Sequence, residues 1–119
     1  MDMENFKIYS IKEIKLIVNN TMKEYGIKEA YLFGSYARGE ATSNSDIDIM
    51  IKIRDKDDYF GLIKLSALEN DLINAFGKSV DLIIEETYTE ETKYDGDNIK
   101  KAKEIFYGEI KKDMLKIYG

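Results

Sequence analysis

Two aspartates stand at alternate positions where an apolar segment begins, and a Gly-Ser pair precedes them in the chain. The pair is Gly34-Ser35, and the aspartates are Asp46 and Asp48. Alternate residues of a strand point to the same face, so the two carboxylates are expected to converge on one patch. Neighbouring carboxylates repel each other unless a cation lies between them, and hard oxygen ligands suit Mg²⁺. A divalent metal beside a small-residue turn that can bind phosphates is typical of enzymes that act on nucleotides.

The elements that would hold these residues can be located by their apolar patterns. A first strand is expected over 29–33, and a second over 47–53, where isoleucine recurs at every other position. Between them, residues 35–38 should form a short helical turn whose free amide groups face an anion. The Gly-Ser pair then lies at the end of one strand, and the two aspartates lie at the start of the next.

A third acid is expected at the same edge of the sheet. A third strand is predicted over 79–84, where Val80, Leu82 and Ile84 form a buried face and Asp81 points the other way. A strand-helix-strand connection normally gives parallel neighbours, so the starts of the second and third strands should lie side by side. Asp81 would then join the two upstream aspartates.

Helices are expected to cover this sheet. The first begins after Ser10, with Glu13 as its capping-box partner, and a second spans 59–76, is capped by 55–58 and is closed by Gly77. A final amphipathic helix has the apolar stripe Ile99, Ala102, Phe106, Ile110, Met114 and Ile117. This order, α-β-β-α-β-α, predicts a single α/β domain over residues 1–119, with a small mixed sheet flanked by helices.

Composition narrows the chemistry further. The chain has 119 residues, a net charge of −5, and neither cysteine nor histidine. Disulfides, thiol nucleophiles, zinc fingers and histidine-based catalysis are therefore excluded. The acidic balance argues against binding to long nucleic acids, which normally requires a basic surface. No signal peptide and no apolar run long enough to cross a bilayer is evident, so we expect no membrane contact and a cytoplasmic location.

The segment from Tyr31 to Ile84 resembles the DNA polymerase beta-like nucleotidyltransferase superfamily. The apolar strand, Gly34-Ser35, the following Arg38-Gly39 and the Ser45-Asp-x-Asp that opens the next strand together match its active-site signature. In length and spacing the chain is similar to the minimal nucleotidyltransferases, many of which are antitoxins paired with a HEPN-domain toxin. The resemblance implies the nucleotidyltransferase fold and a Mg²⁺-dependent transfer of a nucleotide from ATP.

The resemblance also implies roles for individual residues. Asp46, Asp48 and Asp81 would be the catalytic acids and the ligands of two Mg²⁺ ions, with Asp81 also serving as general base. Small or basic residues of the turn and the loop would bind the nucleotide, although some of them could have a purely structural or solvent-exposed role instead. Arg38 would neutralise the leaving pyrophosphate or simply be a solvated arginine, and Ser45 would shape the loop more than touch substrate. The set comprises Gly34, Ser35, Arg38 and Ser45.

The acceptor of the nucleotide is expected to come from outside this domain. Larger relatives have an added helical domain that binds the acceptor. We expect no such domain here, so a second polypeptide or a second copy in a homodimer should supply the acceptor. The function predicted first is a protein adenylyltransferase antitoxin that moves AMP from ATP to a tyrosine hydroxyl of a HEPN-type toxin. Two alternatives stay open: a catalytically relic module that masks its partner, and a transferase that modifies small-molecule drugs. The last helix would either pack on the sheet or contact the partner.

Overall fold

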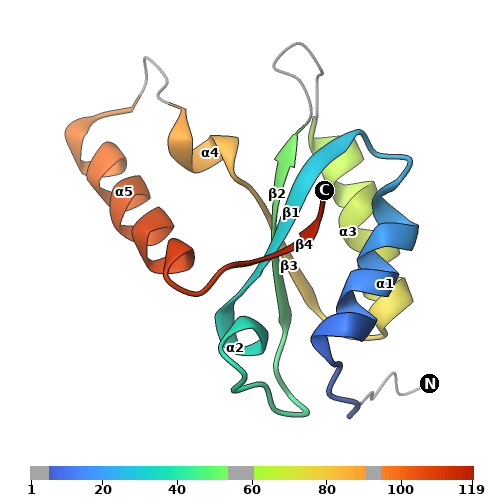
Figure 1. Ribbon diagram of the computed structural model, residues 1–119. Helices are drawn as coiled ribbons and strands as arrows, with labels where there is room; N and C mark the ends of the chain where they lie inside the picture. Colours follow the sequence, from blue (N-terminus) through green and yellow to red (C-terminus); the bar gives the residue numbers. More distant parts are fainter. Residues whose placement is uncertain (1–5, 54–60, 91–94) are drawn as a thin grey trace.

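The computed structural model describes residues 6–53, 61–90 and 95–119. A four-stranded sheet lies between two layers of helices, with α1 and α3 on one face and α5 on the other (Figure 1). The predicted fold class, α/β with a small mixed sheet flanked by helices, is confirmed. The elements in chain order are α1 Ile11–Met22, β1 Ile27–Phe33, α2 Gly34–Ala37, β2 Ile47–Ile53, α3 Leu62–Phe76, β3 Val80–Ile84, α4 Glu86–Thr89, α5 Asp97–Lys111 and β4 Leu115–Tyr118.

The sheet has the strand order β3-β2-β1-β4. β2 lies antiparallel to β1. It lies parallel to β3, as predicted from the strand-helix-strand connection between them. The register places Phe33 opposite Asp48 in the first pair of strands and Asp48 opposite Asp81 in the second. The ends of three strands therefore meet at one edge of the sheet, next to the short helix α2 (Figure 1).

One face of the sheet packs on α1 and α3 and holds the main core. Alternate residues of β2, Ile47, Ile49 and Ile51, are fully buried there. α1 starts with the predicted capping box, in which the Ser10 hydroxyl accepts from the Glu13 amide and the Glu13 carboxylate accepts from the Ser10 amide. The helix partners of the core are Ile14, Val18 and Met22 from α1 and Leu68, Leu72 and Phe76 from α3.

The start of α3 differs from the prediction. Gly61 has an extended backbone, with φ −78° and ψ 177°, so the described helix begins at Leu62 rather than at residue 59. The predicted cap over 55–58 and the predicted first two helical residues lie outside the described residues. The end agrees with the prediction, because Gly77 takes a left-handed conformation (φ +66°) and its amide donates to the Ile73 carbonyl at 2.8 Å.

The C-terminal part of the chain corrects the predicted final helix. α5 stops at Lys111, and Leu115–Tyr118 forms a fourth strand, β4, which pairs antiparallel with β1. Ile117, predicted to lie on the helical stripe, is instead a buried strand residue. No helix in the described part of the chain has both the length and the apolar character needed to span a bilayer.

α5 rests on the second face of the sheet through few side chains. Ile110 is its one buried residue among those described, and it packs with Phe33 and Met50. Farther toward the start of the helix, Ile99 and Phe106 remain 51% and 43% exposed. The apolar stripe of this helix is therefore only partly used for packing.

Candidate active site

The Gly-Ser pair forms the first turn of α2, directly after β1. Gly34 has φ +72°, a backbone conformation that favours glycine. A Cβ atom at this position would overlap Oδ2 of Asp48 and would lie only 3.0 Å from its Cγ. The turn is closed by the Arg38 amide, which donates to the Gly34 carbonyl at 3.1 Å, and by the Glu40 amide, which donates to the Ser35 carbonyl at 2.9 Å. Glycine is thus required here both by φ and by the approach of the Asp48 carboxylate.

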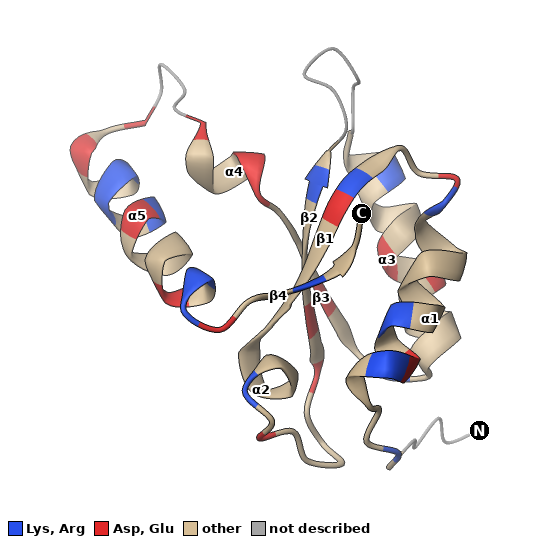
Figure 2. Cartoon of the chain, viewed as in Figure 1, with Lys and Arg blue, Asp and Glu red and all other residues tan. Residues whose placement is uncertain are grey.

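The three predicted acids come to the same edge of the sheet. Asp48 and Asp81 are directly opposite each other in the parallel pair of strands, and Asp46 lies just before β2 begins. Figure 2 shows acidic positions on the ends of β2 and β3 nearest α2. Asp48 is half-buried, whereas Asp46 and Asp81 are exposed. The structure therefore brings together one shielded and two solvent-facing carboxylates beside the Gly34 turn.

These charges change the protonation of the central acid. Burial, followed by the charges of Asp81 and Asp46, raises the pKa of Asp48 to about 6, while the Arg38 guanidinium opposes the shift. A bound cation would remove this repulsion and would favour the carboxylate form.

The donor set suits a hard divalent cation, because all three side chains offer carboxylate oxygens. Across residues 6–53, 61–90 and 95–119, however, no three acids already form a preassembled metal cage. Asp46, Asp48 and Asp81 are the residues that would hold the ion.

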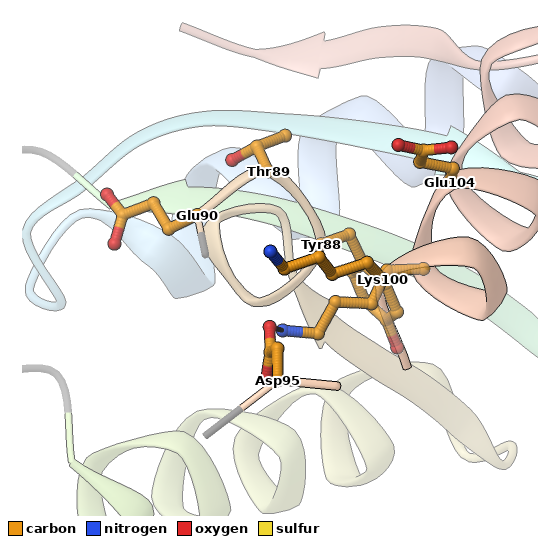
Figure 3. A pocket seen from close by; sticks show the side chains of 7 residues that line it. Tyr88, Thr89, Glu90, Asp95, Lys100 and Glu104 are labelled. Atoms are coloured by element: carbon orange, nitrogen blue, oxygen red, sulfur yellow. Dashed lines mark hydrogen bonds and ion pairs between the residues drawn. The ribbon is translucent and has the colours of Figure 1, made fainter. Parts of the chain in front are cut away.

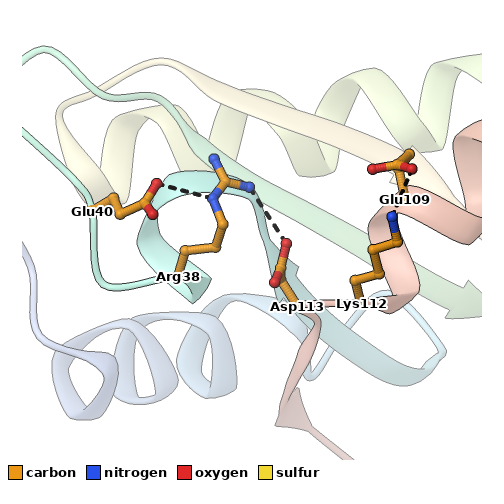
Figure 4. A network of polar contacts seen from close by, with 5 residues as sticks. All are labelled: Arg38, Glu40, Glu109, Lys112 and Asp113. Carbon is orange, nitrogen blue, oxygen red and sulfur yellow. Dashed lines mark hydrogen bonds and ion pairs between the residues drawn. The ribbon is translucent and has the colours of Figure 1, made fainter.

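The remaining predicted residues have defined positions around this edge. Arg38, at the end of α2, pairs with Glu40 through Nε at 3.1 Å and with Asp113 through NH1 at 3.6 Å. Arg38 is therefore an ion-paired residue, and Figure 4 shows its contacts with both acids. The Ser45 hydroxyl accepts from the Thr42 amide at 2.8 Å, which fits its predicted part in shaping the loop. Ser35 lies in α2 beside Gly34, half-buried.

A model of the nucleotidyltransferase domain matches residues 11–113. The chain belongs to this family. It is 41% identical over 81 residues to the Methanocaldococcus jannaschii protein named "Putative protein adenylyltransferase MJ1215", a match that covers 65% of this chain and 91% of the relative. It is 37% identical over 79 residues to the protein adenylyltransferase MntA of Thermococcus cleftensis, covering 63% of this chain and 77% of that protein.

Solved structures of toxin-antitoxin complexes share the fold. A chain of a toxin-antitoxin crystal structure with AMP-PNP superposes with a TM-score of 0.64 at 20% identity, over 88% of this chain and 73% of that chain. A second match is a complex of a tri-AMPylated Shewanella oneidensis HEPN toxin with an MNT antitoxin, with a TM-score of 0.54 at 18% identity, over 92% and 69% of the two chains. The predicted family is confirmed, and the protein is a nucleotidyltransferase enzyme. Enzymes of this family generally use divalent metal ions.

Two contacts around this site could not be predicted from the sequence. Lys78, which is 9% exposed, lies between α3 and β3 and donates from Nζ to the Ser43 carbonyl at 2.8 Å. This contact ties the loop that leads to Asp46 to the far side of the site. The second feature is Asp113, which reaches Arg38 from beyond the end of α5. A single lysine after one helix and a single aspartate after another helix form no sequence pattern from which such long-range contacts could be predicted.

Proposed function

We propose that this enzyme transfers AMP from Mg²⁺-ATP to a tyrosine hydroxyl of a HEPN-type toxin, and that it thereby acts as the antitoxin of a two-protein system. The observation that carries the chemistry is the register that places Asp48 opposite Asp81, beside the Gly34 turn. The choice of a protein acceptor is supported by the names of the curated relatives. The choice of a HEPN toxin is supported by the tri-AMPylated toxin in one structural neighbour.

The residues of this chain divide the reaction among them. Two Mg²⁺ ions, when bound by Asp46, Asp48 and Asp81, would supply the positive charge that orients the triphosphate and acidifies the acceptor hydroxyl. Gly34 allows the phosphates to approach the backbone, because no Cβ intervenes. The Ser35 hydroxyl donates to a phosphate oxygen.

Proton transfer and charge neutralisation complete the reaction. Asp81, exposed at the start of β3, takes the proton of the tyrosine hydroxyl. The tyrosine oxygen then forms a bond to the α-phosphorus. The bond between the α-phosphorus and the oxygen that bridges to the β-phosphate breaks, and pyrophosphate leaves. Arg38, already held at the site by Glu40 and Asp113, neutralises the leaving group.

Adenylylation explains how such a partner would be neutralised. AMP adds a bulky group with a negative phosphate to the toxin surface. Near a surface that binds RNA, this charge repels the RNA backbone. Because the modification is covalent, the affinity between antitoxin and toxin need only be modest.

The test combines this protein, ATP, Mg²⁺ and a HEPN toxin, preferably the product of the neighbouring gene, and reads the product by intact mass spectrometry. The toxin should gain the mass of one or more AMP groups with the wild-type enzyme and none with Asp46→Asn. Glu24→Gln is the matched control, because it removes an exposed carboxylate just beyond the end of α1, and it should behave as wild type.

Toxin that is neutralised equally by Asp46→Asn, without a change of mass, would overturn the proposal and would favour a masking module. Transfer to a small-molecule drug, with none to the toxin, would favour a drug-modifying transferase.

A further inference from the structure

A hollow of about 190 Å³ opens beside the Gly-Ser turn, between the end of β1 and the last part of α5. Gly34 and Arg38 line it on the side of the motif, and Phe106, Glu109 and Ile110 line it on the side of the helix. Gly34 also lies so close to Asp48 that a Cβ atom at this position would overlap the Asp48 carboxylate. The hollow therefore adjoins the edge of the sheet that carries the three aspartates.

The size and lining of the hollow restrict what fits it. Pockets that enclose a whole drug-sized ligand measure about 300–1,000 Å³, so this hollow suits only one end of a nucleotide. Phe33 and Phe106 are among the residues that line it, and aromatic side chains are suited to contact with a flat aromatic system. The Phe106 ring is held by Tyr88 of α4, at 5.0 Å between centroids and 38° between planes. The aromatic wall is therefore positioned before any ligand binds.

The charges on the rim indicate which end of the nucleotide enters. Glu109 and Asp113 contribute carboxylates to the rim (Figure 4). Asp113 is paired with Arg38, and Glu109 with Lys112. Because both acids are ion-paired, the rim has no excess positive charge that would attract the triphosphate, whereas carboxylate oxygens can accept hydrogen bonds from an exocyclic amine. The triphosphate is thus favoured at the Gly34 turn and the three aspartates, and the base is favoured in the hollow.

A second hollow between α4 and α5 does not compete for this role. It measures about 120 Å³ and is lined by polar and charged groups that include Asp95, Lys100 and Glu104 (Figure 3). None of the motif residues lines it. Of these two hollows, the one next to Gly34 is the one that adjoins the turn beside the three aspartates.

We infer that the hollow formed by Phe33, Phe106 and Ile110 binds the purine base of ATP, with Phe106 as the ring against which the base packs. This inference rests on the proposed nucleotide chemistry and assigns to α5 a direct part in substrate binding. The exposed aromatic residue of the helix is then a specificity-determining residue, and its exposure in the absence of ligand is the consequence of an open base site.

The chain contains no tryptophan, so a single reporter can be placed at the hollow. Phe106→Trp should lose fluorescence when Mg²⁺-ATP binds and should respond little to Mg²⁺-tripolyphosphate, which has no base. Ile105→Trp is the matched control, because Ile105 is 59% exposed on the same helix and does not line the hollow. Its fluorescence should not change with either ligand.

Affinities measured by calorimetry complete the test. Phe106→Ala should weaken Mg²⁺-ATP binding about tenfold, as expected for one lost contact between a base and an aromatic ring. The same variant should bind Mg²⁺-tripolyphosphate as the wild type does. Phe106→Leu keeps an apolar side chain in the packing of α5 and should also weaken binding of ATP selectively.

Two results would overturn the inference. The first is unchanged ATP affinity in both Phe106 variants; a raised KM for the toxin in the same variants would then place the acceptor tyrosine in the hollow. The second is an equal loss of ATP and tripolyphosphate binding, which would indicate a displaced helix. Failure of the wild type to bind either ligand would instead refute the proposed function.

Discussion

Gly34 offers a sharp test of how the turn and the acids depend on each other. Gly34 and Gly39 both have φ +72°, so alanine at either position incurs the same kind of backbone strain. They differ in their surroundings: a Cβ at Gly34 would overlap the Asp48 carboxylate, whereas a Cβ at Gly39 would meet no atom within 4 Å. Comparison of Gly34→Ala with Gly39→Ala therefore separates strain from displacement of the acid.

The strain term can be estimated for both variants. A left-handed conformation costs a non-glycine residue roughly 1–2 kcal/mol. In a domain of this size, roughly 1 kcal/mol corresponds to a change of about 4 °C in the melting temperature. Gly39→Ala should therefore melt about 4–8 °C below the wild type and keep its affinity for Mg²⁺-ATP.

Gly34→Ala should add a functional loss to this strain. The new methyl group forces the Asp48 carboxylate to move by several tenths of an ångström or more, away from the position opposite Asp81. A misplacement on the order of 1 Å can lower the rate of a catalysed step roughly 100-fold. We expect transfer of AMP to fall by about this factor, as measured by mass spectrometry of the acceptor at a temperature where both variants are folded. Equal activity of the two alanine variants would refute the steric coupling between Gly34 and Asp48.

Three further predictions concern the acids, the loop and the base. In EDTA, the free energy of unfolding in urea should fall as the pH rises from about 4 to about 6. Burial and the charge of Asp81 raise the pKa of Asp48 to about 6, so that the folded state alone holds this proton in that range; Asp48→Asn should lack this pH dependence. Lys78→Met should speed amide exchange in the loop that its Nζ ties through the Ser43 carbonyl, and it should weaken Mg²⁺-ATP binding by up to about tenfold; unchanged exchange would contradict that role. ATP should bind more tightly than ITP in calorimetry, because the Glu109 carboxylate on the rim accepts from an exocyclic amine and repels a carbonyl; equal affinities would exclude such a contact.

The parts of the structure that follow local patterns could be predicted from the sequence. β2 has the predicted bounds, because alternating isoleucines specify a strand with one face in the core. The juxtaposition of Asp48 and Asp81 followed from the rule that a helical connection joins parallel strands. Both inferences used only chain order and periodicity. The start of α3 was less well determined, since Gly61 carries little information about which side of it the helix begins.

β4 was missed because its sequence also fits a helix. Ile110, Met114 and Ile117 recur at the spacing of a helical stripe, and no proline interrupts them. The strand exists because β1 offers an unpaired edge, to which Leu115–Tyr118 adds with Leu115 opposite Leu32. This pairing is a tertiary effect that overrides local propensity, and a short edge strand of four residues gives little periodicity by which to recognise it.

The missed strand is also what places α5 beside the candidate active site. In an antiparallel pair that matches Leu32 with Leu115, the residues that follow along β1 meet the residues that precede β4. Gly34 therefore comes to Asp113, and both line the same hollow. The ion pair between Arg38 and Asp113 joins the Gly34 turn to the end of α5 across this junction. A helix that buries little of its own surface is thus fixed next to the motif by the strand behind it, and this arrangement leaves its aromatic side chain open to a ligand.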